Sequence, residues 1–290
     1  MFYYYLLTIS AIIPVVALCF FIYKKDVNKE PIGLLAKLFA FGFFSVIPVL
    51  VLELLVSWIF SFLLPPEEAQ GFILTFINVF LSVAIIEEGF KWIITKFFGY
   101  DNQEFDEIYD IIVYSVFVSL GFACVENLLF VLQNGFGNAI MRALLSVPGH
   151  ACFAVIMGYF FALAKINSIN NNKSKVGINL LLSILCPALV HTMYDAILMV
   201  MSRVNNAFVF VFLLLFFVFD IIMVVVCFLT VNKISKIQKN VKASVEKGII
   251  TADSKGHLEI TQQIDIHFCP VCGKPAGENN FCTSCGCKLR

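Results

Sequence analysis

The sequence has little charge of either sign. Asp, Glu, Lys and Arg make up 14% of its 290 residues, and the formal net charge is zero. Without a basic excess there is no electrostatic basis for binding nucleic acid. Hydrophobic residues make up 60% of the chain, and it contains 32 Phe. This composition excludes an ordinary soluble domain and predicts an all-α polytopic membrane protein.

Features of two other protein classes are also missing. The apolar N-terminal run Phe2–Tyr23 lacks a basic leading segment and a small-residue cleavage site. It therefore predicts an uncleaved first span rather than a signal peptide. No internal sequence repeat is visible, and neither are the paired, interrupted spans of many secondary transporters.

Seven apolar runs are present, and they predict about seven transmembrane helices. The runs are Phe2–Tyr23, Leu34–Leu64, Phe72–Phe98, Ile108–Leu132, Ile140–Ala164, Val176–Met201 and Ala207–Val231. The second run is too long for one upright span and carries Pro48 near its middle. We interpret it as one tilted, kinked helix, and a re-entrant hairpin is the alternative.

Lysines follow every second run, which predicts the orientation of the chain in the membrane. They are Lys24, Lys25, Lys29 and Lys37 after the first run, Lys96 after the third, Lys165, Lys173 and Lys175 after the fifth, and Lys233, Lys236, Lys239 and Lys242 after the seventh. The alternate loops hold only Arg142 and Arg203. The positive-inside rule then places the N-terminus outside the cell and the C-terminus in the cytoplasm.

Hydropathy falls after Val231, which divides the chain into three predicted parts. Residues 1–231 form a transmembrane domain, residues 232–265 form a juxtamembrane segment and linker, and residues 266–290 form a zinc ribbon. The linker begins with a lysine-rich stretch that we interpret as a helix.

The third part, residues 266–290, contains a pattern of cysteines that is typical of a metal site. Cys269-Pro-Val-Cys272 and Cys282-Thr-Ser-Cys285 are two CxxC knuckles, each followed by Gly. Four thiolates at this spacing converge tetrahedrally on one Zn²⁺ and leave no open position for catalysis. We therefore predict a small cytoplasmic four-cysteine zinc ribbon with a structural zinc, which docks a partner or regulates the membrane domain. The alternative is a redox or disulfide pair, which a cytoplasmic location disfavours. Cys287 is left over.

The third apolar run carries three ionisable residues within five positions, namely Glu87, Glu88 and Lys91. Such groups cost at least a few kcal/mol each inside a bilayer, so they tend to face a protein interior or a wet cavity. On a helix, Lys91 lies one turn from both carboxylates and can pair with them. The alternative is a structural ion pair that fixes helix packing.

Three further runs also carry polar residues in an organised pattern. Glu126 lies one turn after Phe122, His150 follows Pro-Gly, and His191 and Asp195 share one helix face. An acid one turn from an imidazole can hold its tautomer. Because these residues lie at comparable depths in their runs, we expect them to converge near the membrane middle. For each His alone, the alternative is a packing or hydrogen-bonding residue.

Glu53 and Asp220 are intramembrane acids without an accompanying pattern. We interpret them as packing or proton-handling groups.

Glu-Glu-x-x-Lys, Phe-x-x-x-Glu and His-x-x-x-Asp occur in this order on three predicted helices. The set resembles the PrsW family of bacterial intramembrane proteases, distant relatives of the type II CAAX prenyl endopeptidases and their Abi/CPBP superfamily. The resemblance covers roughly residues 34–201, and the Pro-Gly-His context of His150 is also similar to PrsW members. Lys91 stands where the prenyl endopeptidases carry Arg one residue further on, and Glu126 stands where they carry His. These departures favour the PrsW branch over the prenyl endopeptidases, and they argue against prenylated substrates.

The resemblance implies site residues Glu87, Glu88, Lys91, Glu126, His150, His191 and Asp195 in a multi-pass protein of the bacterial cell membrane. It also implies an activity, the first cleavage of a membrane-anchored anti-sigma factor on its outer side. In such a protease, Glu87 or Glu88 would activate water while the other carboxyl protonates the leaving amine, with Lys91 tuning the pair.

The metal question is open at the level of sequence. His150 and His191 would polarise the scissile carbonyl or bind a metal, and His-His-Glu with an open fourth position is a workable catalytic zinc set. No His-Glu-x-x-His motif is present, so no local pattern decides between glutamate-type and metal-dependent hydrolysis.

Two functions from other classes are compatible with the same residues. A proton- or ion-coupled transporter also uses acids and bases inside spans. A catalytically silent relative would act as an immunity or scaffold protein, with the zinc ribbon as its working part.

Overall fold

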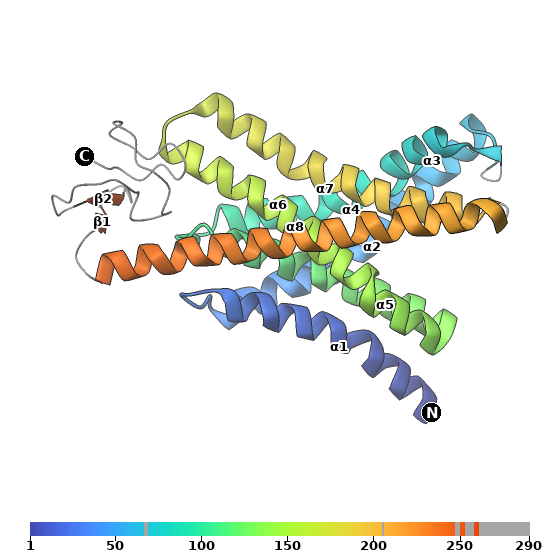
Figure 1. The fold of residues 1–290 in the computed structure, drawn as a ribbon, viewed down its shortest axis with the longest axis horizontal. Helices are drawn as coiled ribbons and strands as arrows, with labels where there is room; N and C mark the ends of the chain where they lie inside the picture. The colour runs from blue at the N-terminus through green and yellow to red at the C-terminus, as the bar shows by residue number, and fades with distance from the viewer. Residues whose placement is uncertain (67–68, 205, 247–249, 253–257, 261–290) are drawn as a thin grey trace.

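The computed structural model describes residues 1–66, 69–204, 206–246, 250–252 and 258–260, and the regular secondary structure of these residues is helical apart from one pair of short strands (Figure 1). The α-helices are α1 Phe2–Lys25, α2 Ile32–Leu63, α3 Phe72–Val79, α4 Ile85–Ile94, α5 Asp110–Leu144, α6 Ser146–Ile169, α7 Lys173–Met201 and α8 Asn206–Glu246. Strands β1 Ile250–Ala252 and β2 Leu258–Ile260 pair antiparallel. The four predicted zinc ligands, Cys269, Cys272, Cys282 and Cys285, lie outside the described residues.

Six stretches of the described chain are long and apolar enough to cross a membrane, which confirms the all-α polytopic prediction. One stretch is 60 residues long, from Asp110 to Ile169, and comprises both α5 and α6. The backbone leaves the helical region between them at Leu145, with φ −120° and ψ −64°. The two helices lie side by side, because the Ser119 hydroxyl of α5 donates to the His150 carbonyl of α6. The count of about seven spans stays a prediction.

Helix α2 is one continuous helix from Ile32 to Leu63 with Pro48 inside it, as the single-helix interpretation expects. Two boundaries differ from the apolar runs. Within α5 the backbone leaves the helical region at Gly135, with φ +79° and ψ −168°, so two helical parts meet at a kink there and the second part runs past the predicted start of the next span to Leu144. Helix α8 passes Val231 without a break and extends to Glu246.

Helix α5 is the central helix, and it packs against α1, α2 and α6. Its approach to α2 is very close. A Cβ atom on Gly42 would lie 1.9 Å from the Val118 carbonyl oxygen, and one on Gly121 would lie 2.1 Å from the Phe39 carbonyl oxygen. Small residues are typical of such contacts between membrane helices. They hold the helix that carries Glu126 tightly against α2.

The third apolar run is not a uniform α-helix. π-helical turns lie on both sides of α4, η2 at Phe80–Ala84 and η3 at Thr95–Tyr100. Such turns change the direction in which side chains point and are frequent at functional sites. Helix α4 carries Glu87, Glu88 and Lys91, so the acid pair lies on a short helical segment with an irregular turn at each end.

Candidate active site

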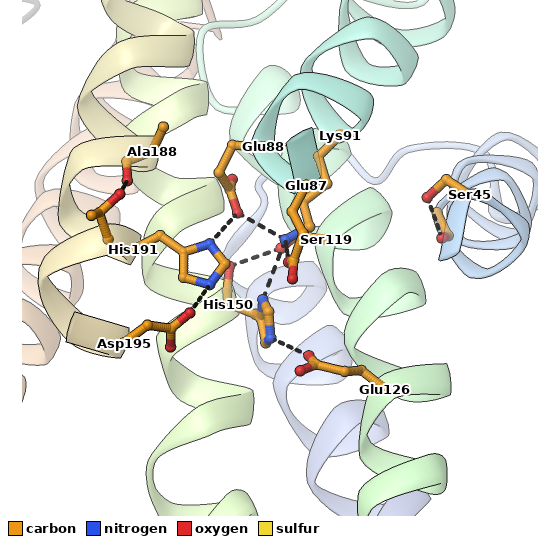
Figure 2. Close-up of polar contacts among 12 residues, drawn as sticks. Ser45, Glu87, Glu88, Lys91, Ser119, Glu126, His150, Ala188, His191 and Asp195 are labelled. Carbon is orange, nitrogen blue, oxygen red and sulfur yellow. Dashed lines mark hydrogen bonds and ion pairs between the residues drawn. The ribbon is translucent and has the colours of Figure 1, made fainter. Parts of the chain in front are cut away.

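Lys91 lies among the buried polar groups of the helix bundle (Figure 2). Its Nζ is 2.9 Å from Glu87 Oε2, 2.8 Å from Glu88 Oε1 and 3.4 Å from His150 Nδ1. These three contacts use all three N–H donors of the ammonium. The Phe122 ring covers the same ammonium, with its centroid 4.3 Å away. The ion pair predicted within α4 is therefore formed, and it also reaches α6.

His150 connects Lys91 to Glu126. Because Nδ1 of His150 accepts from Lys91, Nε2 carries the proton and donates to Glu126 Oε2 across 2.7 Å. Arg142 contacts the same carboxylate oxygen, with Nη2 3.3 Å from Oε2. Arg142 also donates to Asn127 Oδ1 through Nε at 2.8 Å. Glu126 is thus held between an imidazole and a guanidinium.

His191 is held by carboxylates at both ring nitrogens. Nδ1 lies 3.2 Å from Glu88 Oε1, and Nε2 lies 3.3 Å from Asp195 Oδ2. The ring stacks on Phe153, with centroids 4.6 Å apart and planes inclined by 20°. Its orientation is therefore determined by packing as well as by hydrogen bonding.

The seven predicted site residues come from four helices and lie in one group. They are Glu87, Glu88 and Lys91 on α4, Glu126 on α5, His150 on α6, and His191 and Asp195 on α7. The rings of His150 and His191 are 5.7 Å apart between centroids. The α4 residues and both imidazoles are buried, whereas the side chains of Glu126 and Asp195 are 23% and 29% exposed. The group thus has a buried centre and a more accessible edge.

A family model described as "PrsW family intramembrane metalloprotease" matches residues 30–227. The chain belongs to the PrsW family. Among curated proteins, Protease PrsW of Geobacillus kaustophilus is 40% identical over 196 residues, which cover 67% of this chain and 80% of that protein. Protease PrsW of Bacillus subtilis is 36% identical over 195 residues, covering 67% and 83%. No solved structure matches.

PrsW membership makes the chain a protease and a multi-pass bacterial membrane protein. The matched region contains all seven site residues and ends before the Cys-rich segment. It does not favour the transporter or the scaffold function.

The PrsW family name implies a metal, and part of the group fits one. Glu87, Glu88 and His191 each place one ligand atom within 4.8 Å of the other two. Glu88 Oε2 is buried and has no hydrogen-bond partner, so it is free to act as a ligand. This Glu-Glu-His set differs from the His-His-Glu set considered from the sequence, because both nitrogens of His150 are engaged by Lys91 and Glu126.

Two residues of this PrsW protein join the group only through tertiary packing. By sequence Arg142 is a loop charge, yet in the structure it pairs with Glu126. Glu53 on α2 lies outside the sequence pattern, yet its carboxylate interacts electrostatically with Glu87 and Glu126. Its Oε1 is buried without a hydrogen-bond partner. Neither residue has a partner on its own helix turn, so no local spacing could have assigned them.

Proposed function

We propose that this PrsW protease hydrolyses a peptide bond in a membrane-anchored protein, with Glu87 or Glu88 activating the water. The observation that carries this proposal is the placement of two adjacent buried carboxylates on a single ammonium, beside an imidazole that Asp195 orients. Amide hydrolysis needs a base near the attacking water and a proton donor for the leaving amine. A pair of acids whose environments differ can supply both.

The contacts of the two carboxylates suggest how the roles divide. Glu88 is fully buried and contacts both Lys91 and His191. Glu87 contacts Lys91 through Oε2, and it is the more exposed of the two at 6%. For hydrolysis without a metal, we therefore assign the base to Glu87, whose Oε1 can accept a proton from water, whereas with a metal bound Glu87 would be a ligand. Glu88 keeps Lys91 and His191 in place.

Glu87, Glu88 and His191 would hold the metal that the family name implies. A zinc ion bound there supplies Lewis acidity and lowers the pKa of a water. With a metal bound, Asp195 would accept from Nε2–H of His191, and Nδ1 of His191 would then be unprotonated and able to act as a ligand. His150 in this arrangement is a positioning residue, because it acts through Lys91 and Glu126.

The proposed substrate is a membrane-anchored anti-sigma factor, cleaved first on its outer side, as the resemblance to the family implies. In this proposal the N-terminus lies outside and the C-terminus in the cytoplasm. We also propose that this chain, as a PrsW protein, is a distant relative of the Abi/CPBP superfamily.

The C-terminal segment has a separate proposed role. Cys269, Cys272, Cys282 and Cys285 bind a structural zinc, and the ribbon docks a partner or regulates the membrane domain. Removal of residues 266–290 should release one zinc per chain and change the partners that co-purify. Unchanged zinc content after removal would contradict this assignment.

A trapping experiment tests the protease function. The Glu87→Gln/Glu88→Gln variant, expressed in the native host, should retain intact membrane-anchored substrates that the wild-type chain cleaves. These substrates are identified by mass spectrometry after co-purification. Their cleavage is then measured in proteoliposomes with wild-type protein. Full cleavage by the double variant would refute the assigned roles.

A further inference from the structure

A second group of buried carboxylates lies at one end of the bundle, where the α1–α2 turn, the start of α5 and the polar part of α8 come together (Figure 1). It consists of Asp26 after α1, Glu30 in the turn before α2, and Asp110 at the first residue of α5. One oxygen from each carboxylate lies within 4.8 Å of the other two. The three residues are only 3%, 6% and 0% exposed. We call this group the turn cluster.

Several oxygens of the turn cluster have partners. Asp110 Oδ2 accepts from the Glu107 backbone N–H at 2.6 Å, Asp26 Oδ1 accepts from Gln238 Nε2 at 3.3 Å, and Glu30 Oε2 accepts from the Tyr114 hydroxyl. Two other oxygens, Asp110 Oδ1 and Asp26 Oδ2, are buried and accept no hydrogen bond. An unpaired buried acceptor loses its hydration without compensation, so it indicates a missing partner.

The turn cluster also has no counter-ion among the described residues, since no Lys or Arg nitrogen there lies within 4.0 Å of its carboxylates. Lys29 is the adjacent cation, but its Nζ donates to the backbone carbonyls of Tyr23 and Asp26. Burial raises the pKa of both Asp26 and Glu30 above their ordinary values. Three carboxylates this close repel one another, and burial removes the water that would screen them.

We propose that Asp26, Glu30 and Asp110 bind a hard divalent cation, Mg²⁺ or Ca²⁺. An all-oxygen donor set selects these ions over soft metals. Ligands at roughly 2.0–2.6 Å from an ion lie up to about 5 Å apart across it, so three oxygens within 4.8 Å of one another can contact the same ion. Water completes the coordination. The site is separate from the protease site and does not depend on the proposed function.

A cation at the turn cluster connects four elements. It joins the end of α1, the α1–α2 turn and the start of α5 directly. Gln238, which donates to Asp26, brings in α8. Two further bonds support this junction, from Ser235 Oγ to the Lys25 carbonyl at 2.6 Å and from Lys25 Nζ to Asn232 Oδ1 at 2.7 Å. Ion binding therefore fixes the polar part of α8 against the helix bundle.

Terbium luminescence tests the site directly. Tb³⁺ replaces hard divalent cations and is excited through nearby tyrosines, and the Tyr114 hydroxyl contacts Glu30. In the full-length protein in detergent, we expect saturable Tb³⁺ luminescence that excess Ca²⁺ or Mg²⁺ displaces. The more effective competitor identifies the preferred ion. The Glu30→Gln/Asp110→Asn variant should bind Tb³⁺ at least roughly 100-fold more weakly, since even partners of a ligand are worth about 10–100-fold.

Two control variants locate the signal. Asp106→Asn removes an exposed acid from the same loop, and Glu87→Gln/Glu88→Gln removes the intramembrane acid pair. Both should keep the wild-type Tb³⁺ affinity. Equal affinity in the wild type and the Glu30→Gln/Asp110→Asn variant would overturn the proposal.

Thermal unfolding of the wild-type chain keeps the proposal falsifiable if the double variant fails to fold. At constant ionic strength, Mg²⁺ or Ca²⁺ should raise the unfolding temperature of the wild type and of both control variants. If neither ion raises it and Tb³⁺ gives no signal, the turn cluster holds a shared proton rather than a cation, and the proposal is wrong.

Discussion

The described part of the chain has two groups of buried carboxylates, and they differ in how their charge is balanced. In the intramembrane group, Lys91 supplies an ammonium 2.9 Å from Glu87 and 2.8 Å from Glu88. In the turn cluster, the described residues supply no such cation. Buried charges need a partner, and in the intramembrane group this partner is a side chain of the protein itself, Lys91. The second group is left to take its cation from solution.

The largest expected effect concerns the intramembrane pair. Glu87→Gln/Glu88→Gln should reduce the cleavage rate by at least about 10²–10⁴-fold, which is the usual contribution of a general base. The readout is cleavage of the trapped substrate in proteoliposomes. The matched control is Glu30→Gln/Asp110→Asn, which changes equally buried acids outside the site and should retain cleavage in Mg²⁺. Equal losses in both variants would remove the functional distinction between the groups.

Lys91→Met should destabilise the folded protein by about 3–5 kcal/mol, because it leaves two buried carboxylates without their counter-ion. Unfolding is measured in detergent by denaturant titration. Lys91→Met combined with Glu87→Gln and Glu88→Gln should recover most of this loss, since the amides need no cation. If the single and triple variants are equally unstable, the loss comes from packing rather than from charge.

Asp195→Asn should have a smaller effect on activity and little effect on stability. The amide changes the tautomer preference of His191, and losing such a partner typically costs about 10–100-fold in metal affinity or activity. Titration of zinc into a variant lacking residues 266–290 would report on the intramembrane site alone. Unchanged zinc affinity together with unchanged cleavage would exclude a positioning role for Asp195.

The sequence predicted the intramembrane group more completely than the turn cluster, for a physical reason. Helical spacing brings Glu87, Glu88 and Lys91 together within one turn, and His191 and Asp195 within another, so local geometry already determines many of the contacts. The ion pair between Arg142 and Glu126 depends on the kink of α5 at Gly135, and no rule of helical spacing predicts this kink.

Asp26, Glu30 and Asp110 lie outside the apolar runs or at the edge of one, where acids are usually solvated. Only the close packing of α1, α2, α5 and α8 buries them, so no sequence pattern could have singled them out. The existence of most helices, by contrast, follows directly from the apolar runs, because a bilayer requires every backbone group to be satisfied within its own helix.

The smallest expected effect concerns the stability of the turn cluster without a cation. In the absence of divalent ions, Glu30→Gln/Asp110→Asn should be as stable as the wild type or more stable by about 1 kcal/mol, because neutral amides remove repulsion among buried acids. In saturating Mg²⁺ or Ca²⁺ the order should reverse, since only the wild type gains binding energy. Lys91→Met should show no such reversal, because its lost cation was part of the chain. A variant that is less stable than the wild type by the same margin in both conditions would mean that the two groups do not differ in the way their charge is balanced.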